Sequence, residues 1–226
     1  MTRANVIAPL DYIRVRILNF VFLPGVKISD DEIAKTLGMS RSPVREALNR
    51  LVEQGLVESR PNRGFVVKVY TRKEVADHYM LREALECLAV RMAIQSMDRE
   101  KIKSVEDLLA TYPSIMKSHD IARFNAIDER FHDLIALYSD NVALYEALRN
   151  LHGRIRIIRR YDHLRAGSFQ ETYEEHRLIL KHMVRKDIRR AVKLMSYHIL
   201  NSMKTVMRLL PNGSGKGLAS SLESPS

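Results

Sequence analysis

The feature that most restricts the fold of this chain is a pair of short, sharply bounded segments in its first third. Ser29 and Glu32 have the spacing of a capping box, which begins a helix, and Gly38 supplies the turn that ends it. Ser40 begins a second helix with Pro43 in its first turn, where the missing N–H has no cost. The pattern therefore predicts two helices joined by a tight turn, as in a helix-turn-helix.

The segments on either side complete a small domain over residues 1–70. Apolar residues at helical spacing predict a first helix from Val6 to Phe20. After Gly55, the β-rich stretches 56–59 and 65–69 are joined by a basic turn, which predicts a hairpin. Three helices and a β-hairpin form a winged helix-turn-helix.

The second helix of the pair has a buried and an outward side. Val44, Leu48 and Leu51 form the apolar side, so polar and cationic residues lie opposite them. Arginine and asparagine can each hold a base edge through two hydrogen bonds in the major groove. The candidate DNA contacts on this helix and in the hairpin turn are Arg41, Ser42, Arg45, Asn49, Arg50, Arg63 and Gly64. Spacing alone leaves open that these residues form a solvated helix face.

Bulk properties agree with a polyanionic partner. The formal net charge is +10 and the sequence pI is about 9.8, which suits nucleic acid or an acidic membrane. A leader peptide and an apolar run of about 18 residues are both missing, so we expect a cytoplasmic protein with no membrane partner. Cys87 is the single cysteine, which excludes an intrachain disulfide and a thiolate zinc cluster.

The remainder of the chain predicts a mainly α fold. Residues 71–210 form a second, all-helical domain with six expected helices, near 72–97, 99–117, 120–138, 142–161, 168–185 and 187–209. Pro113 falls inside the second of these and would kink or end it. The glycine- and serine-rich tail 211–226 is expected to be disordered.

Four residues of the helical domain form a candidate metal site. Asp128 and His132 lie four residues apart on one helix, so they project from the same side. His176 and His198 lie on the apolar stripes of the last two helices. Three imidazoles and a carboxylate suit zinc, nickel or manganese. Spacing alone favours the alternative that each inward histidine only forms hydrogen bonds.

The first domain resembles the winged helix-turn-helix of GntR-family bacterial regulators. The resemblance lies in Ser40-Arg-Ser-Pro-Val-Arg-Glu-Ala-Leu48, Gly55-Leu-Val57 and Arg63-Gly64-Phe65, and it spans most of residues 9–70. It implies binding to double-stranded operator DNA. Family members commonly have a basic residue where this chain has Asn49. This difference affects which operator sequence the chain recognises and leaves the family's mode of reading DNA intact.

The second domain resembles the FCD ligand-binding domain of the FadR-like GntR subfamily over roughly 72–209. Leu81-Arg82-x-x-Leu85-Glu86, Asp128-x-x-Phe131-His132 and Glu175-His176-Arg177 carry this resemblance. It implies that Asp128, His132, His176 and His198 hold a divalent ion. With six helices, the chain would belong to the VanR-like group.

Further properties follow from the resemblance. It implies a homodimer, usually a repressor, that binds a small carboxylate effector at the metal ion beside an arginine. Arg82 is the candidate arginine, and a surface ion pair with Glu86 is the alternative. Four more arginines at 154, 156, 159 and 160 could line the pocket, face DNA or be solvated.

Two other functions remain as alternatives. The helical domain could be a metal-dependent hydrolase, although no general base or nucleophile pair lies beside the ligands in the sequence. The chain could also be a constitutive DNA-binding protein with a structural metal. We expect a regulator and not an enzyme.

Overall fold

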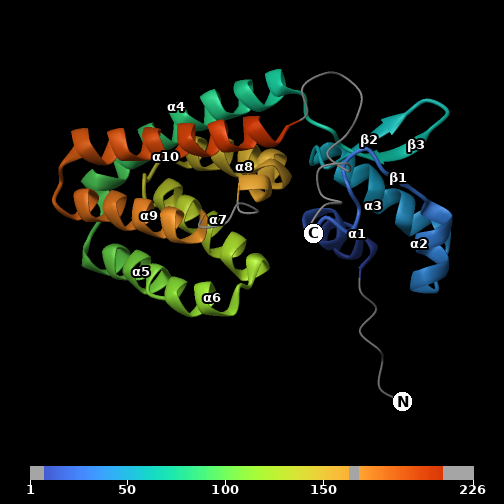
Figure 1. The fold of residues 1–226 in the computed structure, drawn as a ribbon, viewed down its shortest axis with the longest axis horizontal. Coiled ribbons are helices and arrows are strands. Elements are labelled where there is room, and N and C mark those ends of the chain that lie inside the picture. Colours follow the sequence, from blue (N-terminus) through green and yellow to red (C-terminus); the bar gives the residue numbers. More distant parts are fainter. Residues whose placement is uncertain (1–7, 163–167, 211–226) are drawn as a thin grey trace, which may run out of the picture. The chain divides into compact units, whose positions relative to one another are not determined.

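The computed structural model describes residues 8–162 and 168–210 (Figure 1). The chain divides into two compact units. The first comprises the residues up to Thr71 together with the chain from Leu209, and the second is Arg72–Arg208. The tail 211–226, predicted to be disordered, lies outside the described residues.

The first unit is built from short helices and a small sheet. Its helices are α1 (Pro9–Leu18), α2 (Asp30–Leu37) and α3 (Arg41–Glu53). Its strands are β1 (Lys27–Ile28), β2 (Val57–Arg60) and β3 (Gly64–Val67), in the antiparallel order β1-β3-β2. α3 packs against α1, α2 and β2, which buries its apolar side.

Local chemistry explains the bounds of α2 and α3. The Ser29 hydroxyl accepts the backbone N–H of Glu32 at 3.2 Å, as the capping box predicted. Gly38 ends α2 with a φ of 65°, which glycine adopts without strain. Ser40 occupies the N-cap of α3 in an extended conformation, but its side chain makes no capping hydrogen bond.

Two details of the first unit differ from the prediction. The hairpin of β2 and β3 has a third strand beside it, in which Lys27 pairs with Val66. This strand has two residues, which is too short for alternation to reveal it. The first helix ends at Leu18, two residues before the predicted end, and it begins at Pro9, while Val6 at the predicted start lies outside the described residues.

The second unit contains seven helices within the described residues, not the six predicted. They are α4 (Arg72–Ser96), α5 (Arg99–Leu109), α6 (Tyr112–Ser118), α7 (Ile121–Leu137), α8 (Val142–Asp162), α9 (Ser168–Val184) and α10 (Ile188–Leu209). The segment predicted as the second helix forms two helices, α5 and α6. Pro113 cannot continue α5 and instead lies in the first turn of α6. The assignment to the VanR-like group rested on six helices and loses that support.

Helix α7 is central in the second unit. It packs against α4, α5, α6 and α8, and α9 contacts α4, α5 and α6. Helix α10 is tied to α4 by hydrogen bonds, among them Tyr79 to Ser202 at 3.2 Å. Residues placed on α7, α9 and α10 can therefore meet inside the bundle (Figure 1).

None of the helices in the described part of the chain is both long and apolar enough to span a bilayer.

Candidate metal centre and nucleic-acid interface

The outward side of α3 carries five of the predicted DNA contacts. Val44, Leu48 and Leu51 are fully buried, so the opposite side of the helix faces solvent. The exposed residues on that side include Arg41, Ser42, Arg45, Asn49 and Arg50. This set of donors and cations has the chemistry to contact base edges and phosphates.

The arginines of this face pair with nearby acids. Asp30 lies 3.0 Å from Nη2 of Arg41 and 3.8 Å from Nε of Arg45. Arg50 pairs with Glu46 one turn earlier at 2.8 Å. Exposed ion pairs of this kind contribute about 0–1 kcal/mol each, so phosphate oxygens can replace the acids at low cost.

The turn between β2 and β3 presents the other two predicted contacts. Arg63 and Gly64 are both exposed there. Asn62 and Gly64 adopt φ values of 59° and 72°, a left-handed conformation that asparagine and glycine tolerate best. The turn is therefore a narrow basic projection, as the predicted wing requires.

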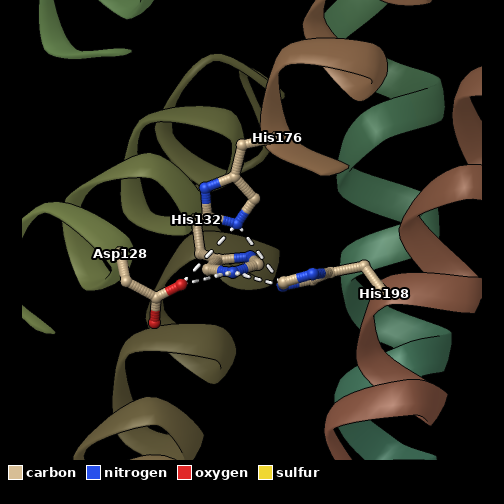
Figure 2. A group of neighbouring side chains, drawn as sticks. All are labelled: Asp128, His132, His176 and His198. Carbon is tan, nitrogen blue, oxygen red and sulfur yellow. Dashed lines mark hydrogen bonds and ion pairs between the residues drawn. The ribbon is translucent and has the colours of Figure 1, made fainter. Parts of the chain in front are cut away.

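The four predicted metal ligands converge inside the second unit, and Figure 2 shows their side chains pointing toward one another. Asp128 and His132 extend from α7, His176 from α9 and His198 from α10. Their candidate ligand atoms all lie within 4.8 Å of one another. All four residues are at most 5% exposed.

The spacing of these atoms fits a metal ion. Nε2 of His198 lies 3.3 Å from Nε2 of His132 and 3.4 Å from Nε2 of His176. Oδ1 of Asp128 lies 3.7 and 3.6 Å from the same two histidine nitrogens. Ligands about 2.0–2.1 Å from a tetrahedral zinc ion are about 3.3–3.4 Å apart, so the donor set could hold such an ion with little movement.

Burial favours the neutral form that a metal requires of histidine. It lowers the pKa of His132 and holds the pKa of His176 well below its usual value, with His198 and His132 adding to the effect on His176. A neutral imidazole offers a lone pair on one ring nitrogen, so these histidines can act as ligands.

Each histidine also has a partner on its other ring nitrogen, Nδ1. His132 donates from Nδ1 to Oε2 of Glu86, and His198 donates to Oε2 of Glu175 at 2.6 Å. Nδ1 of His176 lies 2.9 Å from the Tyr112 hydroxyl. Such partners fix the ring orientation and direct Nε2 toward the metal, as in carboxylate–histidine–zinc sites.

Glu86 is ionised despite its burial. Burial acts to raise the pKa of its carboxyl group, but the Arg82 charge and contacts with His132 and His152 outweigh it and hold the pKa well below its usual range. The charged carboxylate is a strong acceptor, so it fixes the proton of His132 on Nδ1.

Two arginines flank the cluster. Arg82 donates from Nε to Oε1 of Glu86 at 2.6 Å and from Nη2 to Nε2 of His132 at 3.0 Å. The pair with Glu86 considered from the sequence therefore exists, but it is buried and not on the surface, with Arg82 only 1% exposed. Arg159 donates from Nη2 to Oδ2 of Asp128 at 2.5 Å.

The four arginines of α8 lie in different environments in the structure. Arg159 is buried at the cluster, whereas Arg154 is exposed. Arg156 pairs with Glu129 at 3.1 Å, and Arg160 is half-buried. Arg159 lies beside the metal ligands, which agrees with the first of the three alternatives, that these arginines line the pocket.

Sequence reasoning missed most partners of the ligands. Glu86 and Glu175 stand in the segments that carry the FCD resemblance, Glu175 directly before His176, so their positions held a signal. Tyr112 and His152 have no such neighbour in the sequence. They reach the cluster only because α6 packs on α9 and α8 packs on α4 and α7.

Comparison with known families covers most of the chain. Residues 77–201 match the FCD domain, and residues 10–67 match the family described as bacterial regulatory proteins, gntR family. The first match contains all four residues of the buried cluster, and the second contains α3 and the wing.

Individual relatives are regulators. The uncharacterized HTH-type transcriptional regulator YdhC of Bacillus subtilis is 28% identical over 198 residues, covering 87% of this chain and 88% of the relative. The HTH-type transcriptional repressor RspR of Escherichia coli is 26% identical over 171 residues, covering 76% and 72%. The structure of E. coli McbR/YncC has a TM-score of 0.75 at 20% identity over 92% of this chain and 99% of that one, and shows the same fold.

Proposed function

The chain belongs to the GntR family of bacterial regulatory proteins and carries an FCD domain, and from this premise we propose that it is a repressor whose operator affinity is set by a small carboxylate bound at a metal ion. The observation that carries the proposal is the buried convergence of Asp128, His132, His176 and His198 in the unit that follows the DNA-binding domain.

The DNA-binding half of the proposal uses α3 and the wing. We expect the exposed side of α3 to enter the major groove, with Arg45 and Asn49 at base edges and Arg41 at phosphate. Arg63 and Gly64 of the wing would contact the backbone of the duplex. A homodimer presents two copies of α3, which suits an operator with two half-sites. The similarity to the repressor RspR supports repression.

The sensing half uses the buried cluster. Three imidazoles and one carboxylate suit a borderline ion, namely zinc, nickel or manganese. When bound, such an ion supplies a Lewis-acid position at which the acid group of an effector can bind. Glu86, Glu175 and Tyr112 hold the three histidine rings in the orientation that this site needs.

Arg82 is the first candidate contact for the effector. Nε2 of His132 has a single lone pair, which serves either Nη2 of Arg82 or a metal ion. If an ion were bound at Nε2 of His132, Nη2 of Arg82 would be available beside the site, while Nε of Arg82 is held by Glu86. A guanidinium held in this way can bind the carboxylate of an effector.

Arg159 is a second candidate contact. Its Nη2 atom is engaged by Asp128, but Nη1 is buried with no hydrogen-bond partner in the described structure. A buried charged donor without a partner is costly, so an anion at this position would be strongly favoured.

Regulation requires that the effector bind two states of the protein with different affinity. The test is to select duplex fragments of genomic DNA with zinc-loaded protein and then titrate a panel of small organic acids. We expect at least one acid to change operator affinity about tenfold or more, as coupling of 1–3 kcal/mol implies. Protein that binds no duplex specifically at moderate salt would contradict the regulator, and operator binding that no acid changes would favour a structural metal.

A further inference from the structure

A fourth buried histidine lies beside the cluster without joining it. His152 on α8 is 5% exposed, and its two ring nitrogens face carboxylates on two other helices. Nε2 donates to Oε1 of Glu86 on α4 at 3.0 Å, and Nδ1 lies 3.1 Å from Oδ1 of Asp133 on α7. The ring therefore contacts acidic side chains of two other helices, and its Nε2–H ties α8 to Glu86 of α4.

Glu86 is the group through which this ring reaches the cluster. Its Oε1 atom accepts from both Arg82 and His152, and its Oε2 atom accepts from Nδ1 of His132. The donors come from α4, α8 and α7, so the carboxylate is held on three sides. A carboxylate held in this way allows one orientation and one tautomer of the His132 ring, with Nε2 toward the other ligands.

We propose that His152 is a positioning residue for the metal centre, which acts by fixing Glu86 and through it the ring of His132. The inference rests on the proposed metal site but concerns a residue outside the ligand set. The link runs from Asp133, whose side chain is 33% exposed, through His152 and Glu86 to His132, whose side chain is fully buried.

A purely structural role would not require this chemistry. Around His152, the inward residues Leu148, Leu151 and Ile155 of α8 are buried and apolar, so an aliphatic side chain would suit the packing. The imidazole differs from such a side chain in its hydrogen bond to Glu86 and its polar contact with Asp133. Because a buried polar group is unfavourable without partners, the contacts of His152 with two carboxylates indicate that the imidazole has a role other than packing.

The test compares two substitutions of His152 by their zinc affinity, measured by competition with a chromogenic chelator. His152→Leu removes both contacts at similar volume, and we expect zinc affinity to fall about tenfold, the lower end of the range for outer partners of metal ligands. His152→Gln keeps an N–H donor near the position of Nε2, and we expect affinity within about threefold of the unaltered protein.

A second readout does not depend on bound metal. In chelator-treated protein, the ¹⁵N spectrum of the histidine rings should show His132 as the Nδ1–H tautomer. We expect His152→Leu to give a mixture of tautomers at His132 and His152→Gln to restore the single form. A change of stability alone would not alter this signal.

The matched control is His182→Leu. His182 on α9 is a half-buried histidine that, like His152, lies beside an aspartate, with Nδ1 3.3 Å from Oδ2 of Asp187. This pair includes no contact with the cluster, so zinc affinity should stay unchanged. Equal losses in His182→Leu and His152→Leu would overturn the proposal.

Other outcomes are also decisive. Unchanged zinc affinity in His152→Leu overturns the positioning role, and failure of His152→Gln to restore affinity overturns the hydrogen-bond mechanism. If His152→Leu does not fold, Asp133→Asn weakens the outer end of the link and should lower zinc affinity, by less than the roughly tenfold loss expected for a direct partner of a metal ligand. Unchanged zinc affinity in Asp133→Asn also overturns the proposal. Unaltered protein that binds no zinc would instead refute the proposed metal centre.

Discussion

The outward side of α3 and the buried cluster are opposite kinds of site. The α3 side is exposed, and its arginines pair with acids in contact with solvent, such as Asp30 and Glu46. The cluster is at most 5% exposed, and each of its histidines is held by a partner at the second ring nitrogen. Both sites contain polar residues, but only the side chains of the buried cluster are held in a fixed orientation before a ligand binds.

This difference predicts how substitutions at each site affect ligand binding and the stability of the fold. Side chains on α3 exchange weak exposed pairs for contacts with DNA, so their removal should change binding and leave folding nearly unaffected. Cluster side chains are buried with their partners, so their removal should change both ligand binding and stability. Four predictions test this contrast, in order of decreasing effect.

The largest effect is expected from His176→Ala. His176 is fully buried and supplies one of four converging ligand atoms, so its loss leaves an incomplete donor set. We expect the metal content of purified protein to fall from about one ion per chain to nearly none, measured by elemental analysis. His182→Ala is the control, and unchanged metal content in His176→Ala would remove this residue from the site.

Metal removal should come next. Ligand at about 1,000 times its Kd stabilises the folded state by about 4 kcal/mol, so a chelator should lower the melting temperature of the helical unit by several degrees. The winged helix-turn-helix contains none of the cluster residues, and its melting should not shift. Equal shifts in the melting temperatures of both units, or no shift in either, would contradict the expected difference between the two sites.

Arg45→Ala should affect DNA alone. Arg45 is exposed on α3 and its pair with Asp30 is long, so we expect a loss of about 1–3 kcal/mol in specific DNA binding with stability unchanged. Fluorescence anisotropy with the selected operator measures this loss. Arg149→Ala, an exposed arginine on α8, controls for the change in net charge. Equal affinity for the operator in Arg45→Ala would exclude a specific role.

The smallest effect is expected from Glu175→Gln. Oε2 of Glu175 accepts from His198 at 2.6 Å but does not contribute to the converging ligand set. We expect metal affinity to fall about tenfold while one ion per chain is retained, measured by chelator competition. Glu174→Gln, the exposed neighbour that pairs with Arg177, is the control. An effect as large as that of His176→Ala would place Glu175 among the ligands.

Much of the chain could be predicted from local rules. The cap at Ser29, the turn at Gly38 and the apolar side of α3 each depend on neighbours a few residues away. The structure shows the turn, the apolar side and the Ser29 half of the predicted capping box, in which the hydroxyl accepts the N–H of Glu32. Pro113 indicated that the helix predicted over 99–117 would kink or end, and this segment forms the two helices α5 and α6. The strand β1 was missed because a two-residue strand has no repeat of its own.

The sequence by itself determined which side chains could meet within a helix, as for Asp128 and His132, because helical geometry places residues four apart on one side. Only the tertiary structure decided that His176 and His198 meet them, since the packing of helices distant in sequence brings the rings together. The same packing placed Glu86, His152 and Tyr112 behind the ligands, because a buried hydrogen bond depends on where two helices touch and not on any spacing along the chain.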